Sequence, residues 1–312
     1  MPFLPIGGQA VLEGVMMRSP SGMAVAVRRA DGSLAYLEKP FVSITRRVGA
    51  LGLPIVRGAV SLFETIYLGI SALNFSADEV SKESADSPEP KQSPWWGITQ
   101  GLVVVLSLAI GIALFVVLPA RLTAWLGFHD RVGFGLVDGL FRLLAFLLYL
   151  VLISQWRDMA RVLGYHGAEH KALHALENRA PLTPESVQSF PRLHPRCGTT
   201  FLFIVVVVSI VAFTAIGRPR GIGDHLLRVA CMPLIAGVAF EFIRLSARYQ
   251  HLAWVRALTW PGMQFQLLTT REPDLSMCEV AIAALERVRG DETVAAMERA
   301  GGVARPEIAF IQ

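Results

Sequence analysis

The sequence predicts a mainly α-helical membrane protein, a polytopic bundle of about four spans with a small α+β cap on its cytoplasmic side. Hydrophobic residues make up 53% of the 312 residues and charged residues only 17%, against about 25% charged residues in an ordinary soluble domain. The mean hydropathy is +0.48. Four apolar stretches are long enough for a helix to cross a hydrocarbon core of about 30 Å, which takes roughly 20 residues.

The four predicted spans are Gly97–Ala120, Gly133–Gln155, Thr199–Gly217 and Gly223–Ser246. The first and third are nearly free of charge, whereas the second and fourth contain ionisable residues. A buried helix of a soluble core is the alternative for these two, and the even spacing of all four around short loops favours spans. The first residues have neither the basic region nor the apolar core of a cleavable signal peptide.

The placement of Lys and Arg predicts the orientation. Most of these residues outside the spans fall on one side, while the two short loops on the other side carry Arg121, Arg131, Arg218 and Arg220. Because loops rich in Lys and Arg stay in the cytoplasm, both termini and the loop 157–198 are expected there. Basic residues flanking a membrane also account for the net charge of +4, so the bilayer is the predicted partner and no nucleic acid is needed.

The part before the first span divides into three predicted segments. In residues 1–52, "MAVAVRR" and "SLAYLEK" flank Asp31-Gly32, which is the pattern of a β-hairpin. Residues 53–75 are apolar at helical spacing but contain Arg57 and Glu64, which favours an amphipathic helix lying in the membrane interface. Residues 76–96 form a polar linker without periodicity.

Two further segments complete the predicted organisation. Residues 97–246 form the four-span bundle, including the cytoplasmic loop 157–198, and residues 247–312 form a cytoplasmic tail. Within the tail, Met277–Val288 has the apolar spacing of an amphipathic helix that docks by one face. The three cysteines, Cys197, Cys231 and Cys278, are scattered and odd in number, so no disulfide framework is expected.

The stretch "YHGAEHKALHALE" indicates a metal site. In a helix, residues four apart project from one face, so His166 and His170 are predicted to share a metal ion. With Glu169 they match the H-x-x-E-H pattern of inverted zinc peptidases, in which two histidines bind zinc and the glutamate is the general base. His174 and Glu177 continue the same stripe as a third ligand or as partners of the imidazoles.

A second element, His194-Pro-Arg-Cys197, has a spacing common in zinc sites. Taken alone, it is better explained as a solvent-facing loop histidine followed by a small buried apolar cysteine. The predicted topology brings both elements to one membrane face, and Glu241 and Arg244 lie about one turn inside that face, where an ionisable residue is costly unless paired or functional. The predicted ligands of zinc are therefore His166, His170, His194, Cys197 and Glu241.

Three functions fit this group of residues. In a zinc-dependent hydrolase, Glu169 would be the general base for a water activated by zinc, and Arg196 or Arg244 would stabilise the oxyanion. In a non-catalytic scaffold or assembly factor, the same cluster would be a structural zinc site or a metal-free clasp between helices. In a transporter, Glu241, Arg244 and Arg142 would line the path, although no pair of broken helices supports this.

Four motifs in order, "GGQAVLEGVMMRSP", "YHGAEHKALHALE", "HPRCGTTF" and "PGMQFQLLTTREP", resemble the DUF1385 family of bacterial membrane proteins, the YqhQ-like group, described as predicted metal-dependent enzymes of unknown reaction. The resemblance runs from about Gly7 to the C-terminal amphipathic helix and implies a multi-pass protein of the bacterial inner membrane. Its signature positions here are Gln9, Glu13, Arg18, His166, Glu169, His170, Lys171, His194, Arg196, Cys197, Glu241, Thr270, Arg271 and Glu272.

The resemblance adds Gln9, Glu13, Arg18, Lys171 and Arg271 as candidate contacts for a substrate or partner. One departure is Ala172-Leu173-His174, where polar residues are expected after the lysine. The leading expectation is thus a zinc-dependent hydrolase at the cytoplasmic membrane face, with a substrate that the sequence does not name.

Overall fold

The computed structural model describes residues 6–82, 96–195, 197–249 and 252–288. Its N-terminal part is an antiparallel sheet of four strands in the order β1-β2-β3-β4. The strands are β1 (Gly7–Val11), β2 (Gly14–Arg18), β3 (Gly22–Arg28) and β4 (Leu34–Pro40). The predicted hairpin is thus present as β3 and β4, and Gly32 has the positive φ of +85° that favours glycine in its turn.

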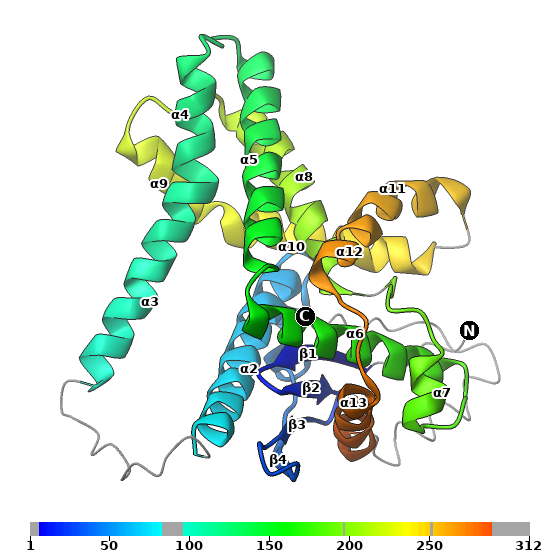
Figure 1. The fold of residues 1–312 in the computed structure, drawn as a ribbon. Helices are drawn as coiled ribbons and strands as arrows, with labels where there is room; N and C mark the ends of the chain where they lie inside the picture. The colour runs from blue at the N-terminus through cyan, green and yellow to red at the C-terminus, as the bar shows by residue number, and fades with distance from the viewer. Residues whose placement is uncertain (1–5, 83–95, 196, 250–251, 289–312) are drawn as a thin grey trace.

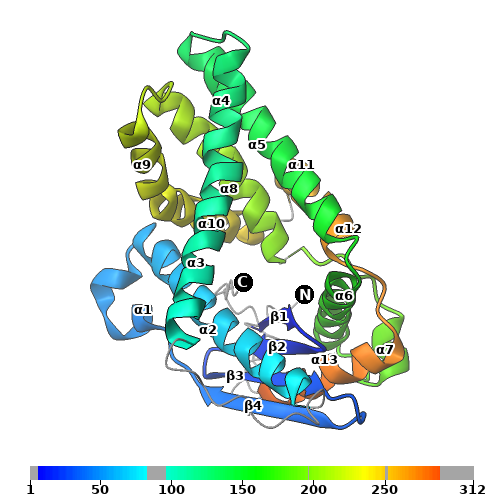
Figure 2. The ribbon, with the colours of Figure 1, turned by 60° about the vertical axis from the view of Figure 1, so that its left-hand side comes forward.

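Helices cover both faces of this sheet (Figure 2). Side chains alternate along a strand, so Val15 and Met17 pack against α6 (Arg157–Glu177) and α13 (Leu275–Val288), whereas Met16 packs against α2 (Val56–Ser81). The predicted amphipathic helix of the tail is therefore present as α13, and its apolar face is buried on the sheet and on α6.

The remaining long helices rise away from the sheet (Figure 1). They are α3 (Trp96–Ile112), the π-helical turn η2 (Ala113–Val117), α4 (Leu118–Trp125), α5 (Arg131–Ile153), α8 (Gly198–Ile216), α9 (Ile222–Ala230) and α10 (Met232–Arg248). Gly135 and Gly139 let α5 approach α8 closely, since a Cβ at Gly139 would lie 2.4 Å from Ile210 Cγ1. Small residues four apart are a common device for close packing of membrane helices.

Within the described residues, five helical segments are long and apolar enough to cross a membrane: 56–81, 101–125, 131–153, 198–216 and 222–246. Four correspond to the predicted spans, and the last of these is divided at Cys231, with Pro233 in the first turn of α10. The fifth is α2, which the sequence indicated to be a shorter interfacial helix.

Two charges argued against a span at α2, and both are paired in the structure. Arg57 Nη2 lies 2.5 Å from Glu241 Oε2, and Glu64 Oε2 lies 3.6 Å from Arg18 Nη2. The helix also continues to Ser81, through residues predicted to be linker. The rest of that linker, 83–95, lies outside the described residues, as do residues 289–312 of the tail.

Short elements connect these parts. They are α1 (Ile44–Arg47), the 3-10 helix η1 (Gly49–Gly52), α7 (Pro184–Gln188), α11 (Ala253–Gln264) and α12 (Gln266–Thr269). The start of α7 is capped by Thr183, whose side chain accepts a hydrogen bond from Ser186 N. Helix α6 therefore lies on the sheet, beside the bases of α5 and α8, and carries the histidine stripe to that junction (Figure 1).

Candidate metal centre

Helix α6 presents His166 and His170 with their rings in contact, at a centroid separation of 4.4 Å. His166 Nδ1 lies 2.7 Å from the carbonyl oxygen of Thr269, and His170 Nδ1 lies 2.6 Å from that of Arg192. A carbonyl oxygen only accepts hydrogen bonds, so Nδ1 carries the proton in both rings. Each Nε2 is left with a lone pair, the state in which imidazole binds a metal.

Cys197 completes this group from another part of the chain. It is the N-cap of α8, and its Sγ lies 3.3 Å from His166 Nε2. Hydrogen bonds from the Thr199 amide and contact with the Thr199 hydroxyl favour a thiolate at Sγ. The ligand atoms of His166, His170 and Cys197 all lie within 4.8 Å of one another.

His170 is 1% exposed, and its ring interacts with the Cys197 side chain. Burial lowers the pKa of His170 to about 4, so its ring is neutral at physiological pH. We refer to His166, His170 and Cys197 as the His/Cys group.

Glu169 lies beside the His/Cys group and is 2% exposed. The backbone amide of Gly8 donates to its carboxylate, while Oε2 is buried with no hydrogen bond among the described residues. Burial raises the pKa of Glu169 to about 8, partly offset by His166 and by the Gly8 amide. A Cβ at Gly8 would lie 2.9 Å from Glu169 Cδ and 2.7 Å from Met16 O, so only glycine lets β1 approach this closely.

His194 belongs to a second buried group with His174 and Glu177. Its Nε2 lies 3.1 Å from Glu177 Oε1. The loop carrying His194 is held by Gln266, which accepts from His194 N and donates to His194 O, both at 2.8 Å. Gln266 has no role among the residues predicted from the sequence, although it lies in the motif "PGMQFQLLTTREP" as an amide inside the apolar run "FQLL".

The structure does not bring Glu241 to the His/Cys group. Both of its carboxylate oxygens accept hydrogen bonds from Arg57, at 2.6 and 2.5 Å. The charge of Arg244 acts on this same carboxylate, so Arg244 stands with the pair between α2 and α10. Arg196 lies outside the described residues.

Two of the other predicted contacts fix α6 and its neighbours. Lys171 Nζ donates to the carbonyl oxygens of Gln188 and Phe190, at 2.8 and 2.7 Å, and pairs with Glu272. Arg271 Nη2 donates to Ser154 O at 2.6 Å. Thr270 is buried, and its hydroxyl donates to a carbonyl in its own helix.

The N-terminal candidates lie at three different places. Glu13 pairs with Arg161 of α6 and accepts from the Tyr165 hydroxyl, which fixes the β1-β2 turn on that helix. Arg18 pairs with Glu64 and stacks over Phe41. Only Gln9 faces an open space next to the His/Cys group.

That space is a groove of about 290 Å³ between β1, α2 and α6. It is lined mainly by apolar side chains, with one amide and one ring of the His/Cys group: Gln9, Ala10, Thr65, Val162, Leu163 and His166. The Gln9 amide lies against Gly69 of α2, where a Cβ would be 2.6 Å from Oε1. The groove therefore gives a route from outside to His166.

The fold and this site define a class: proteins with membrane-type helices and a buried His/Cys group at the base of the helical bundle. The chain belongs to the DUF1385 family, whose model is described as "Protein of unknown function" and matches residues 53–291. It is 32% identical over 290 residues to the uncharacterized protein YqhQ of Bacillus subtilis (strain 168), covering 88% of this chain and 89% of that protein. No solved structure matches the chain.

Proposed function

We propose that this protein is a zinc-dependent hydrolase at the cytoplasmic face of the bacterial inner membrane. The observation that carries the proposal is the engagement of His194 by Glu177, which leaves His166, His170 and Cys197 as the ligand set. A structural zinc site has four protein ligands, whereas a catalytic site has three and keeps one position open. The geometry therefore favours catalysis over the closed set that includes His194.

The residues of the His/Cys group suit zinc. Two imidazole nitrogens and a thiolate are ligands that zinc takes, and the carbonyl oxygens on both Nδ1 atoms hold each ring so that Nε2 faces the group. His170 interacts with the Cys197 sulfur, so the two groups are close enough to share a metal ion. Zinc bound there would supply a Lewis acid.

The chain's own residues then supply proton transfer and orientation. Gly8 N–H holds one oxygen of Glu169. With a cation bound beside it, Glu169 would ionise more readily, and its other oxygen would then take a proton from the attacking water and return it to the leaving group. Arg196 precedes Cys197 directly and is the residue proposed to stabilise the oxyanion. We assign no catalytic role to Arg244, because it neighbours Glu241.

The groove supports a substrate that has an apolar part. Ala10, Val162 and Leu163 line it, and α2, one of the five segments with the composition of a span, forms one wall. A molecule resident in the bilayer could reach His166 along this wall without passing through water. Gln9 is placed to donate a hydrogen bond to a carbonyl of such a substrate.

A non-catalytic scaffold is the competing proposal, and a specific observation favours it. His170, Lys171 and His174 of α6 all bond to backbone carbonyls between residues 188 and 193. These contacts join α6 to the loop before α8, so the same residues could serve only to hold the cap on the bundle. A transport path is less well supported, because Arg142 pairs with Asp138 and lies apart from the Arg57–Glu241 pair.

Metal analysis separates these proposals. The detergent-purified protein should hold about one equivalent of zinc by mass spectrometry. His170→Ala and Cys197→Ser should lose it, while Glu169→Gln and a control at a distant histidine, His129→Ala, should retain it. If the folded wild-type protein binds no zinc when zinc is supplied, the hydrolase proposal is wrong. The cluster is then a metal-free contact between α6 and the loop before α8.

Activity is tested on the organism's own membrane lipids and membrane-associated peptides. Zinc-loaded wild-type protein should generate products, detected by mass spectrometry, that Glu169→Gln does not generate although it holds zinc. A protein that holds zinc yet gives the same product profile as Glu169→Gln would support the scaffold with a structural metal.

A further inference from the structure

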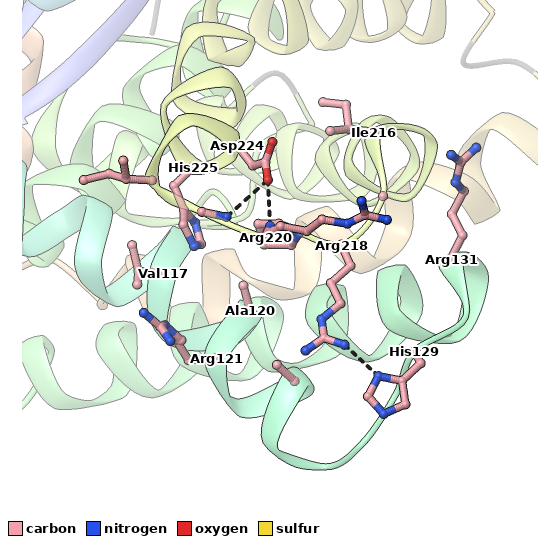
Figure 3. Close-up of a pocket in the computed structure, with 15 residues that line it drawn as sticks. Val117, Ala120, Arg121, His129, Arg131, Ile216, Arg218, Arg220, Asp224 and His225 are labelled. Atoms are coloured by element: carbon pink, nitrogen blue, oxygen red, sulfur yellow. Dashed lines mark hydrogen bonds between the residues drawn. The ribbon is translucent and has the colours of Figure 1, made fainter.

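A pocket lined by polar and charged side chains lies far from the His/Cys group, at the other end of the helical bundle. It has a volume of about 960 Å³. The end of α4, the start of α5, the connection between α8 and α9, and the first turn of α9 surround it (Figure 3). None of the motifs discussed above contributes to it.

The lining of this pocket is strongly basic. It contains Arg121, Arg131, Arg218 and Arg220, together with His129 and His225, against one carboxylate, Asp224. The Asp224 carboxylate is already engaged, because it accepts from the backbone amides of Arg220 and Gly221 at 2.6 and 3.3 Å. Among the described residues, none of the four guanidiniums forms a salt bridge.

One arginine is held in place by a neutral ring. Arg218 Nη1 lies 2.6 Å from His129 Nδ1 (Figure 3). A guanidinium only donates hydrogen bonds, so His129 accepts at Nδ1. This contact orients the Arg218 fork without neutralising its charge.

The helices beneath the pocket add further positive charge. Arg142 and Arg228 share a single carboxylate, Asp138, at 3.1 and 3.2 Å, and all three are buried. Arg228 also donates to the carbonyl of Gly217, a lining residue. Two buried cations against one anion leave an excess positive charge, and low-dielectric walls focus its field into the pocket.

We propose that this pocket binds a phosphate group. Guanidinium forks match the oxygens of phosphate and form two parallel hydrogen bonds with it. The lining has one carboxylate against four guanidiniums, which disfavours a cation, and it is too polar and charged for an apolar ligand. This site is independent of the proposed hydrolase.

The position of the pocket makes an anionic phospholipid headgroup one source of that phosphate. Trp125, at the end of α4, is 82% exposed, and exposed tryptophans of membrane helices lie at the level of the headgroups. The elements that line the pocket, the end of α4 and the connection between α8 and α9, lie at the same end of the bundle (Figure 1). A phosphate carried by a soluble molecule is the other source with the same chemistry.

The test measures binding of fluorescent phosphatidylglycerol to the full-length protein in phosphatidylcholine nanodiscs. A pocket variant, Arg218→Gln with Arg220→Gln, is compared with a matched control, Arg157→Gln with Arg256→Gln, which removes two exposed arginines elsewhere. Arg218 and Arg220 each offer a guanidinium fork to the phosphate, a charge-assisted contact that glutamine cannot make. The pocket variant should therefore bind roughly tenfold more weakly or worse, while the control stays within about twofold of wild type.

Competition distinguishes the two sources. If glycerol 3-phosphate or inorganic phosphate displaces the lipid from the wild type, the ligand is a soluble phosphate; if neither does, it is a lipid headgroup. Arg121→Gln, in α4, is an independent pocket variant that should also bind phosphatidylglycerol more weakly than wild type. Equal affinity of wild type and both pocket variants for phosphatidylglycerol, or equal affinity of the wild type for phosphatidylcholine, would overturn the proposal.

Discussion

His194 and Glu177 form a buried hydrogen bond, with Nε2 of the ring 3.1 Å from Oε1 of the carboxylate. A carboxylate accepts, so this Nε2 carries the proton and is not available to a metal. The pair lies next to the His/Cys group, with the rings of His170 and His194 at a centroid separation of 5.7 Å. Because His194 bonds to Glu177, the neighbouring His/Cys group offers a metal ion three possible ligands rather than four.

Replacing His194 should leave metal binding intact. In His194→Gln the Glu177 carboxylate can keep a donor from this position, whereas His194→Ala removes that donor from a buried carboxylate, at a cost of about 1–3 kcal/mol. We expect both variants to hold one equivalent of zinc and only His194→Ala to be clearly less stable in denaturant unfolding. Loss of zinc from the well-folded Gln variant would show that His194 is a ligand.

Acid should destabilise the metal-free protein partly through His194. Burial lowers the pKa of this ring to about 4, below the value of about 6.5 for an unfolded chain. Between these two pH values the unfolded state binds the proton and the folded state does not, so stability is lost as pH falls, by about 1.4 kcal/mol per pH unit.

His170 has the same shift and should add a similar slope. Glu169, whose pKa is raised to about 8, gives the opposite slope over this range, because the folded state keeps its proton. In urea unfolding of chelator-treated protein between pH 7 and pH 4.5, His194→Gln should therefore differ from wild type by the slope of one ring, about 1.4 kcal/mol per pH unit. An unchanged slope in the variant would mean that His194 is protonated in the folded protein.

Gly8→Ala should disturb both the sheet and the site. The added Cβ would lie 2.7 Å from Met16 O and 2.9 Å from Glu169 Cδ, and overpacking of this kind costs about 1–3 kcal/mol. Gly49→Ala, where no atom lies within 4 Å of the added Cβ, is the control and should be near neutral. Thermal unfolding of both variants checks this, and equal melting temperatures would contradict the close approach of β1 to Glu169.

Glu241→Gln should weaken the contact between α2 and α10 without releasing zinc. Its partner Arg57 is about a quarter exposed, and pairs of this exposure contribute about 0–1 kcal/mol. A double-mutant cycle with Arg57→Gln should give a coupling in that range, and zinc content should match wild type in all three variants. If Glu241→Gln alone loses zinc, Glu241 is a zinc ligand, as the sequence predicted.

Much of the architecture follows from local patterns in the sequence. The length of four apolar runs, the Asp31-Gly32 turn and the spacing of α13 each depend on residues close together in the chain. The sequence predicted a shorter interfacial helix where the structure has α2, because the pairing of its charges depends on residues far apart in the chain. Arg57 and Glu64 appear as unpaired charges in the sequence, and their partners, Glu241 and Arg18, are distant along the chain.

The candidate site divides in the same way. His166 and His170 share a helix face because the helical repeat places residues four apart on one side, whatever surrounds the helix. Packing between distant segments brings Cys197 to them, turns His194 to Glu177, places Gly8 against Glu169 and gathers four arginines around one pocket. A histidine or a carboxylate has several acceptable partners, and the packing of distant elements selects among them.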